Sequence, residues 1–151
     1  MENDVFKPLG MKTAGFGRPH SKERPNEPTL HRKGANGYEP EAEGQAPALS
    51  ALAAAGNVHC SIRDFARFTS YELNGTQGND ALLQPATAKR FQSLTEDRPA
   101  EGRSFFGGSP FISSGCILWP SKNLAAVVAV NAGGANDAVR AVMDAIKERE
   151  P

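Results

Sequence analysis

Side chains able to bind a metal or attack a carbonyl are few and widely separated in this sequence. The three histidines, His20, His31 and His59, have no partners at ligand spacing and no paired carboxylates nearby, so no metal site is predicted. The sequence contains no Cys-x-x-Cys, His-Glu-x-x-His, P-loop or Rossmann glycine pattern, and no cofactor is expected. We expect His20 and His31 to be solvated.

His59, Cys60 and Ser61 are the one cluster that could suggest a nucleophile. Neighbours on an extended segment point to opposite sides, which argues against a thiol–imidazole pair. Ser61 could be a nucleophile, but a serine that caps a helix explains it fully. With only two cysteines, Cys60 and Cys116, we expect buried small side chains and no disulfide. No catalytic residue is therefore predicted.

The elements that would position any site are clearest between Phe105 and Gly134. This long apolar run predicts two strands joined by a tight turn at Pro120–Asn123, whose residues favour turns. Leu124–Val130 is continuously apolar, so this strand should be covered on both faces. Gly107, Gly108 and Ser109 stand just before the hairpin. Residues without a Cβ let a ligand come close, although a bend where the strand begins explains them equally well.

Helices are expected both before and after this run in the sequence. Ser61 and Asp64 form a capping-box-like pair that starts a helix over 61–74, closed by Asn74-Gly75. A last helix starts at Asn136 or Asp137 and runs to 149. Pro85 opens a short helix that a polar linker, 95–103, follows. Each helix has an apolar stripe that should face inward. In the helix over 61–74 these residues are Ile62, Phe65, Ala66, Thr69 and Leu73. In the helix from Pro85 they are Ala88, Phe91 and Leu94, and in the last helix they are Val139, Val142, Met143 and Ile146.

The first third is poorer in apolar residues. Residues 1–12 are a short amphipathic piece stopped by Pro8, with Val5, Phe6, Leu9 and Met11 as contacts; we expect the tail of a helix. Residues 13–48 are rich in proline and glycine and predict a long surface loop. It would be ordered only where Phe16, Leu30 or Tyr38 finds a pocket.

Composition bounds the function. The chain has 151 residues, predicting one domain, 1–151. It carries 17 positive and 17 negative side chains, which argues against nucleic-acid or membrane binding driven by charge. No apolar run approaches the roughly 20 residues of a membrane span. The N-terminus lacks a signal-peptide core.

Three segments together resemble the C-terminal part of the serine β-lactamase and penicillin-binding-protein-like hydrolases, which include the class C β-lactamases. Residues 5–16 resemble the family's F-x-P-L-G-M-x-x-T-x-F, with Thr13 two residues after Met11 instead of three. Residues 55–68 resemble A-G-G-x-x-S-x-x-D-x-A-x-F, with Asn57 in place of the second glycine and one additional residue before Ser61. Phe106-Gly107-Gly108-Ser109, followed by the hairpin and Asn131, resembles the third active-site motif, Lys/His-x-Gly, and the P-x-x-x-L-A-V-V-V-x-x-N that follows it.

The resemblance implies hydrolysis of a β-lactam, peptide or ester bond by acyl transfer. In the family a Ser-x-x-Lys motif supplies the nucleophile and a Tyr-x-Asn motif follows it; neither occurs in this sequence. Phe106 replaces the basic residue of the third motif and cannot relay a proton. The resemblance implies that Ser109 donates its backbone N–H to an oxyanion, on an edge strand formed by Phe106, Gly107, Gly108 and Ser109. This chain would be inactive alone.

The fold implied is α+β: a partial β-lactamase-like domain with a small antiparallel sheet of two to three strands, packed by helices 61–74 and 136–149. We expect a small acyl substrate as ligand, and either an N-terminal hydrolase segment or a second copy as partner, because an unpaired strand edge favours association. The alternative is a degenerate, non-catalytic binding module. Family members are often periplasmic or secreted, and the sequence does not fix the location.

Overall fold

A computed structural model describes residues 1–18, 26–41, 56–79, 82–84, 86–87 and 103–149, and all structural statements concern these residues. His20, residues 42–55 and nearly all of the expected helix from Pro85 and of the linker 95–103 lie outside them. The described elements are η1 (Glu2–Phe6), β1 (Gly15–Phe16), β2 (His31–Gly34), β3 (Gly37–Pro40), β4 (Val58–His59), α2 (Ile62–Thr76), β5 (Arg103–Ser109), β6 (Ile112–Trp119), η3 (Pro120–Lys122), β7 (Leu124–Val130) and α4 (Asn136–Arg149).

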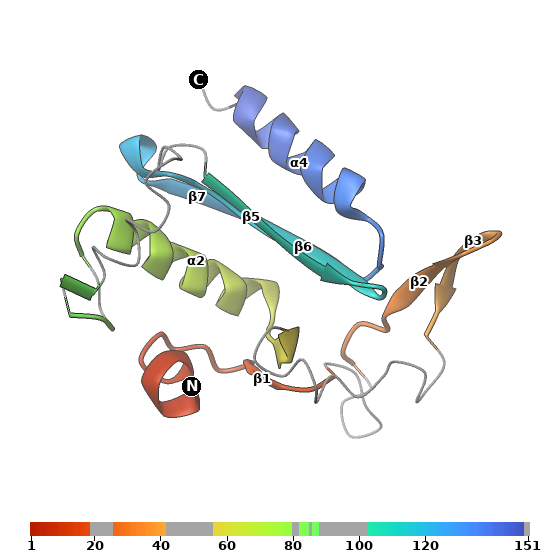
Figure 1. The fold of residues 1–151 in the computed structure, drawn as a ribbon, viewed down its shortest axis with the longest axis horizontal. Coiled ribbons are helices and arrows are strands. Elements are labelled where there is room, and N and C mark those ends of the chain that lie inside the picture. Colours follow the sequence, from red (N-terminus) through yellow and green to blue (C-terminus); the bar gives the residue numbers. More distant parts are fainter. Residues whose placement is uncertain (19–25, 42–55, 80–81, 85, 88–102, 150–151) are drawn as a thin grey trace.

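The core is a three-stranded antiparallel sheet in the order β5-β6-β7, with α4 on one face and α2 on the other (Figure 1). The expected α+β class is confirmed. Both helices pack mainly on β6 and β7, so the expectation that Leu124–Val130 is covered on both faces is confirmed. The turn at Pro120–Asn123 is also confirmed: it is a 3-10 turn ending at Asn123, whose φ is 50°.

The prediction of only two strands across 105–134 was wrong. A second turn at Pro110–Phe111 divides the first of them into β5 and β6, which pair from Arg103↔Leu118 to Ser109↔Ile112. Proline favours the second position of such a turn, and the Ser109 hydroxyl accepts a hydrogen bond from the Phe111 amide at 3.2 Å. The turn residues Gly107, Gly108, Ser109 and Pro110 are present in the sequence, but interpreting them as the bend where a strand begins hid this turn.

The core between the sheet and α4 follows the predicted stripe with one exception. Val139 and Met143 are buried, and Met143 packs with Ile117 and Trp119 of β6. Ile146 is partly buried against the same cluster. Val142 is 46% exposed, because residues 139, 143 and 146 already complete the face that meets the sheet.

Helix α2 begins as predicted and ends later. Ser61 is the N-cap, and its hydroxyl accepts from the Asp64 amide. The predicted stop at Asn74-Gly75 was wrong, since the helix continues to Thr76 and the positive φ falls at Gly78. The inward residues on α2 are Thr69 and Leu73, which are buried, with Phe65 and Ala66 half-buried; Ile62, expected among them, is 46% exposed.

The N-terminal segment is fastened to the start of α2. One helical turn, η1, ends before Pro8, and Phe6 and Met11 are buried. The Thr13 amide and hydroxyl each donate to one carboxylate oxygen of Asp64, both at 2.6 Å. The Thr13 hydroxyl also lies 2.8 Å from the Ser61 hydroxyl and accepts from the Ser61 amide at 3.0 Å. Asp64 therefore does not complete the capping box; Thr13 takes that place.

Residues 13–48 are not the single loop that was expected. Gly15–Phe16 pairs with Val58–His59, and His31–Pro40 forms a hairpin, β2–β3, that projects beyond the end of the sheet (Figure 1). Phe16 and Tyr38 are about half exposed, so neither fills a pocket. The hairpin joins the body at its first residue, where the His31 amide donates to the Asn131 carbonyl at 2.8 Å and the Gly133 amide donates to the His31 carbonyl at 2.9 Å.

Candidate active-site wall

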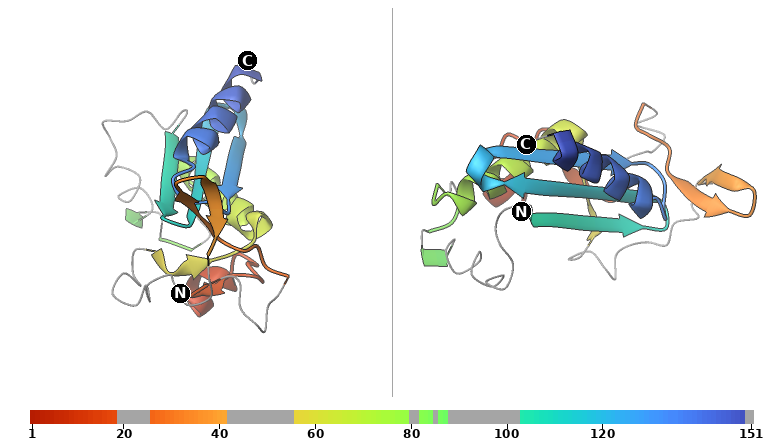
Figure 2. Two further views of the ribbon diagram at one scale, coloured as in Figure 1. Left: turned by 90° about the vertical axis from the view of Figure 1, so that its right-hand side faces the viewer. Right: turned by 90° about the horizontal axis from the view of Figure 1, so that it is seen from above.

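The four predicted site residues lie together on β5, the strand at one side of the sheet (Figure 2). Gly107 and Gly108 are not a bend where a strand begins; they are the last part of β5, opposite Ser114 and Ser113. Phe106, Gly107 and Gly108 are exposed, and Ser109 is half-buried. A molecule could thus approach the backbone here without meeting a Cβ.

The first turns of α4 bring polar groups beside this strand. The Arg140 guanidinium lies over the Phe106 ring, 5.5 Å from its centroid. A Cβ placed on Gly108 would lie 3.6 Å from the Asn136 side-chain oxygen. On the neighbouring strand the Ser113 hydroxyl is buried and has no hydrogen-bond partner among the described residues. Strand and helix together form a surface with a cation and an amide, and the Ser113 hydroxyl lies buried beneath it.

Sequence reasoning missed Arg140 and Asn136 as candidate site residues. They stand four residues apart at the start of α4, which places them on one helix face. That spacing is visible in the sequence, but it does not show that this face meets Phe106 and Gly108. The contact depends on how β5 pairs with β6 and on how α4 lies on β6 and β7.

The other candidates have structural roles. The Ser61 hydroxyl caps α2 and contacts Thr13, as expected for an N-cap. His59 Nδ1 lies 3.0 Å from the Gly17 carbonyl oxygen. His31 is half-buried at the base of its hairpin, and not simply solvated as expected. Within the described residues, no three His, Cys, Asp or Glu side chains gather as a metal site would require.

Both cysteines are free, as expected. Cys116 is buried and Cys60 only partly so. Burial raises the pKa of both thiols; the Asp64 carboxylate adds to the effect at Cys60, and the Thr69 hydrogen bond opposes it at Cys116. Neither thiol is therefore poised as a thiolate nucleophile at neutral pH.

We predict that Cys60 reacts with a disulfide reagent faster than Cys116 by about tenfold or more, because access limits the buried thiol. Thiol release at pH 8, with mass spectrometry to locate the label, would measure both rates. In denaturing urea the two rates should become similar. Equal rates in the folded protein would contradict the burial of Cys116.

None of the described helices is both long enough and apolar enough to cross a lipid bilayer.

The comparison with known families gives a match over nearly the whole chain. The model of the family described as "Beta-lactamase" matches residues 1–149. A search of curated proteins found no match. The matched range includes the Thr13–Asp64 junction, β5 and the first turns of α4, and the chain belongs to the Beta-lactamase family.

Proposed function

We propose that this chain forms one wall of the cleft of a β-lactamase-type serine hydrolase and is inactive alone. The reaction would be acyl-transfer hydrolysis of a β-lactam, peptide or ester bond. The observation that carries the proposal is the exposed stretch Phe106–Gly108 on β5, beside the Arg140 guanidinium. The nucleophile and base would come from a segment that bears Ser-x-x-Lys and Tyr-x-Asn.

Each part of the wall has a task in that reaction. The two glycines allow an acyl group to lie against the strand. The family's oxyanion donor would be a backbone N–H of this stretch, an interaction worth about 3 kcal/mol of transition-state stabilisation. Phe106 supplies no charge where the family has a basic residue. Arg140 supplies a cation beside it, which would attract a carboxylate on the substrate.

The test is complementation. The purified chain should not hydrolyse a chromogenic β-lactam or a short-chain ester. Adding a family segment with Ser-x-x-Lys and Tyr-x-Asn should restore turnover, and the same segment with alanine for its motif serine should not. Turnover by the chain alone would overturn the inactivity, and failure of every such segment to bind would overturn the proposed role.

In the complemented enzyme, Arg140→Gln is expected to raise KM for an anionic substrate about fivefold, with little change for a neutral ester. The lost interaction is the attraction between the guanidinium and the substrate carboxylate. Steady-state kinetics on both substrates would measure it. Arg149→Gln, in the last turn of the same helix, is the control. An equal change for both substrates would show that Arg140 acts only through packing.

The binding-module alternative draws support from the hairpin β2–β3. Both residues of its turn and every residue of β3 are exposed, and a two-stranded hairpin is marginally stable without cover. A partner on this hairpin would give it that cover. Deleting residues 33–38 should then abolish partner binding and leave the hydrolytic activity of the complemented enzyme unchanged. If the deletion abolished only that activity, the hairpin would instead be part of the hydrolase.

A further inference from the structure

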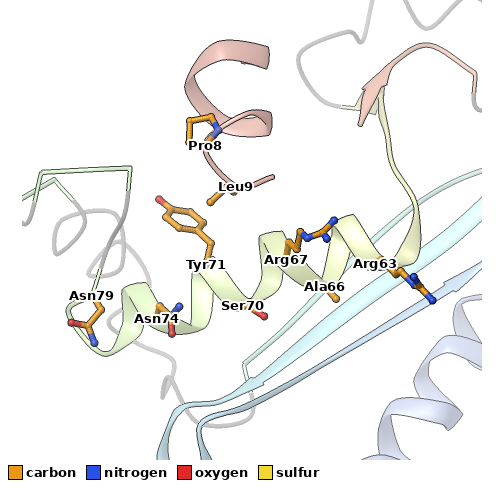
Figure 3. Close-up of a pocket in the computed structure, with 9 residues that line it drawn as sticks. All are labelled: Pro8, Leu9, Arg63, Ala66, Arg67, Ser70, Tyr71, Asn74 and Asn79. Atoms are coloured by element: carbon orange, nitrogen blue, oxygen red, sulfur yellow. The ribbon is translucent and has the colours of Figure 1, made fainter. Parts of the chain in front are cut away.

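A groove on the side of α2 away from the sheet has the composition of a ligand site. It has a volume of about 450 Å³ and runs between the Pro8–Leu9 turn and α2 (Figure 3). Small-molecule sites usually measure about 300–1,000 Å³. The groove is separate from β5, because α2 stands between it and the sheet (Figure 1). We propose that it binds a small monocarboxylic acid with an apolar body.

The charge of the groove favours an anion. Arg63 and Arg67 line it one helical turn apart, and its described lining contains no Asp or Glu. Arg67 contacts the Asp64 carboxylate through Nη1, which leaves its other N–H groups for a ligand. Arg63 is exposed and forms no ion pair with any described residue. Guanidinium groups bind carboxylates through paired hydrogen bonds.

The other residues that line the groove determine which uncharged part of a ligand could bind beside the carboxylate. The Tyr71 ring projects toward Leu9 across the groove (Figure 3), and Pro8 extends this apolar side. The Asn74 amide offers a hydrogen-bond donor and acceptor further along α2. One of the two arginines is already shared with Asp64, so the groove has about one positive charge to offer. A single carboxylate with an aryl or alkyl body fits this arrangement better than a phosphate or a polyanion.

The test compares 3-phenylpropionate with its neutral amide, 3-phenylpropionamide, by calorimetry and by amide chemical shifts. The acid should bind at least about tenfold more tightly than the amide, and Arg63→Gln should weaken its binding about fivefold. Shifts should appear along residues 63–74 and at Leu9. Arg149→Gln, on α4, is the matched control and should leave the affinity unchanged.

Three results would overturn the proposal. One is equal binding of acid and amide, and another is an Arg63→Gln variant that binds like the parent. The third is the absence of detectable binding at acid concentrations up to about 10 mM, because a Kd above that value is too weak for a specific binding site. Because these measurements involve neither β5 nor hydrolysis, their outcome is independent of the complementation test.

Discussion

Replacing Asp64 by asparagine is expected to lower the free energy of unfolding by about 2–4 kcal/mol, because it leaves buried donors unpaired. Asp64 is 1% exposed. One of its carboxylate oxygens accepts from the Thr13 amide and hydroxyl, and the other contacts Arg67. An asparagine has only one acceptor oxygen, so its NH₂ would face either the Thr13 donors or the guanidinium.

The same carboxylate makes stability depend on pH. Burial alone would raise the pKa of Asp64, but the hydrogen bonds from Thr13 and the charge of Arg67 outweigh it and hold the pKa below its ordinary value. The stabilisation is therefore present above the unfolded-state pKa of about 3.9 and is lost as the pH falls through the lower folded-state pKa. The difference between parent and Asp64→Asn should shrink below about pH 4.

Urea unfolding between pH 3 and 7 would measure both effects. Asp144→Asn is the matched control, since Asp144 pairs with Lys147 at 3.3 Å on an exposed helix face and should cost at most about 0.5 kcal/mol. If Asp64→Asn were as mild as this control, Asp64 could not be the residue that holds the N-terminal segment on α2.

The sequence predicted correctly those elements whose signal lies in a few neighbouring residues. Ser61 marks the start of α2, and the spacing of Val139, Met143 and Ile146 marks the buried face of α4. The run Leu124–Val130 predicted a covered strand because it is continuously apolar, and in the structure a helix lies on each of its faces. In each case a few consecutive residues carry the whole signal.

What the sequence did not show depends on distant partners. Thr13 reaches Asp64 across 51 residues of sequence, and a capping box was the natural local interpretation of Asp64. The hairpin at 31–40 has no apolar alternation, and its anchor is the backbone of Asn131 and Gly133. Arg140 becomes a candidate site residue only through its contact with Phe106. Resemblance could not find it, because Phe106 itself departs from the family motif.

The candidate wall is fixed in place at the end of the sheet where three segments meet. The turn at Pro110–Phe111 directly follows Ser109. The turn at 131–134 leads into α4 and thus to Asn136 and Arg140. His31 of β2 bonds to this second turn. The position of the wall relative to α4 therefore depends on how closely the two turns pack, and Gly133 is where they touch.

Gly133→Ala is expected to lower the free energy of unfolding by about 3 kcal/mol or more, because overpacking against backbone cannot be relieved by a rotamer change. A Cβ on Gly133 would overlap the carbonyl group of Pro110 and crowd the Phe111 amide. Either the Pro110 turn moves away, displacing Ser109, or the 131–134 turn moves and breaks the bond from the Gly133 amide to His31. Urea unfolding, with the amide shifts of Ser109 and His31, would show the cost and which turn moves.

Gly134→Ala separates this overlap from backbone strain. Gly134 has a φ of 69°, and a Cβ there would meet nothing within 4 Å. Its replacement should therefore cost only the left-handed conformation, about 1–2 kcal/mol. Gly133 is not among the glycines with positive φ, so its larger cost can come only from contact with the Pro110 turn. A Gly133→Ala variant no less stable than Gly134→Ala would mean that the two turns are not packed together, and that the wall on β5 is free to move relative to α4.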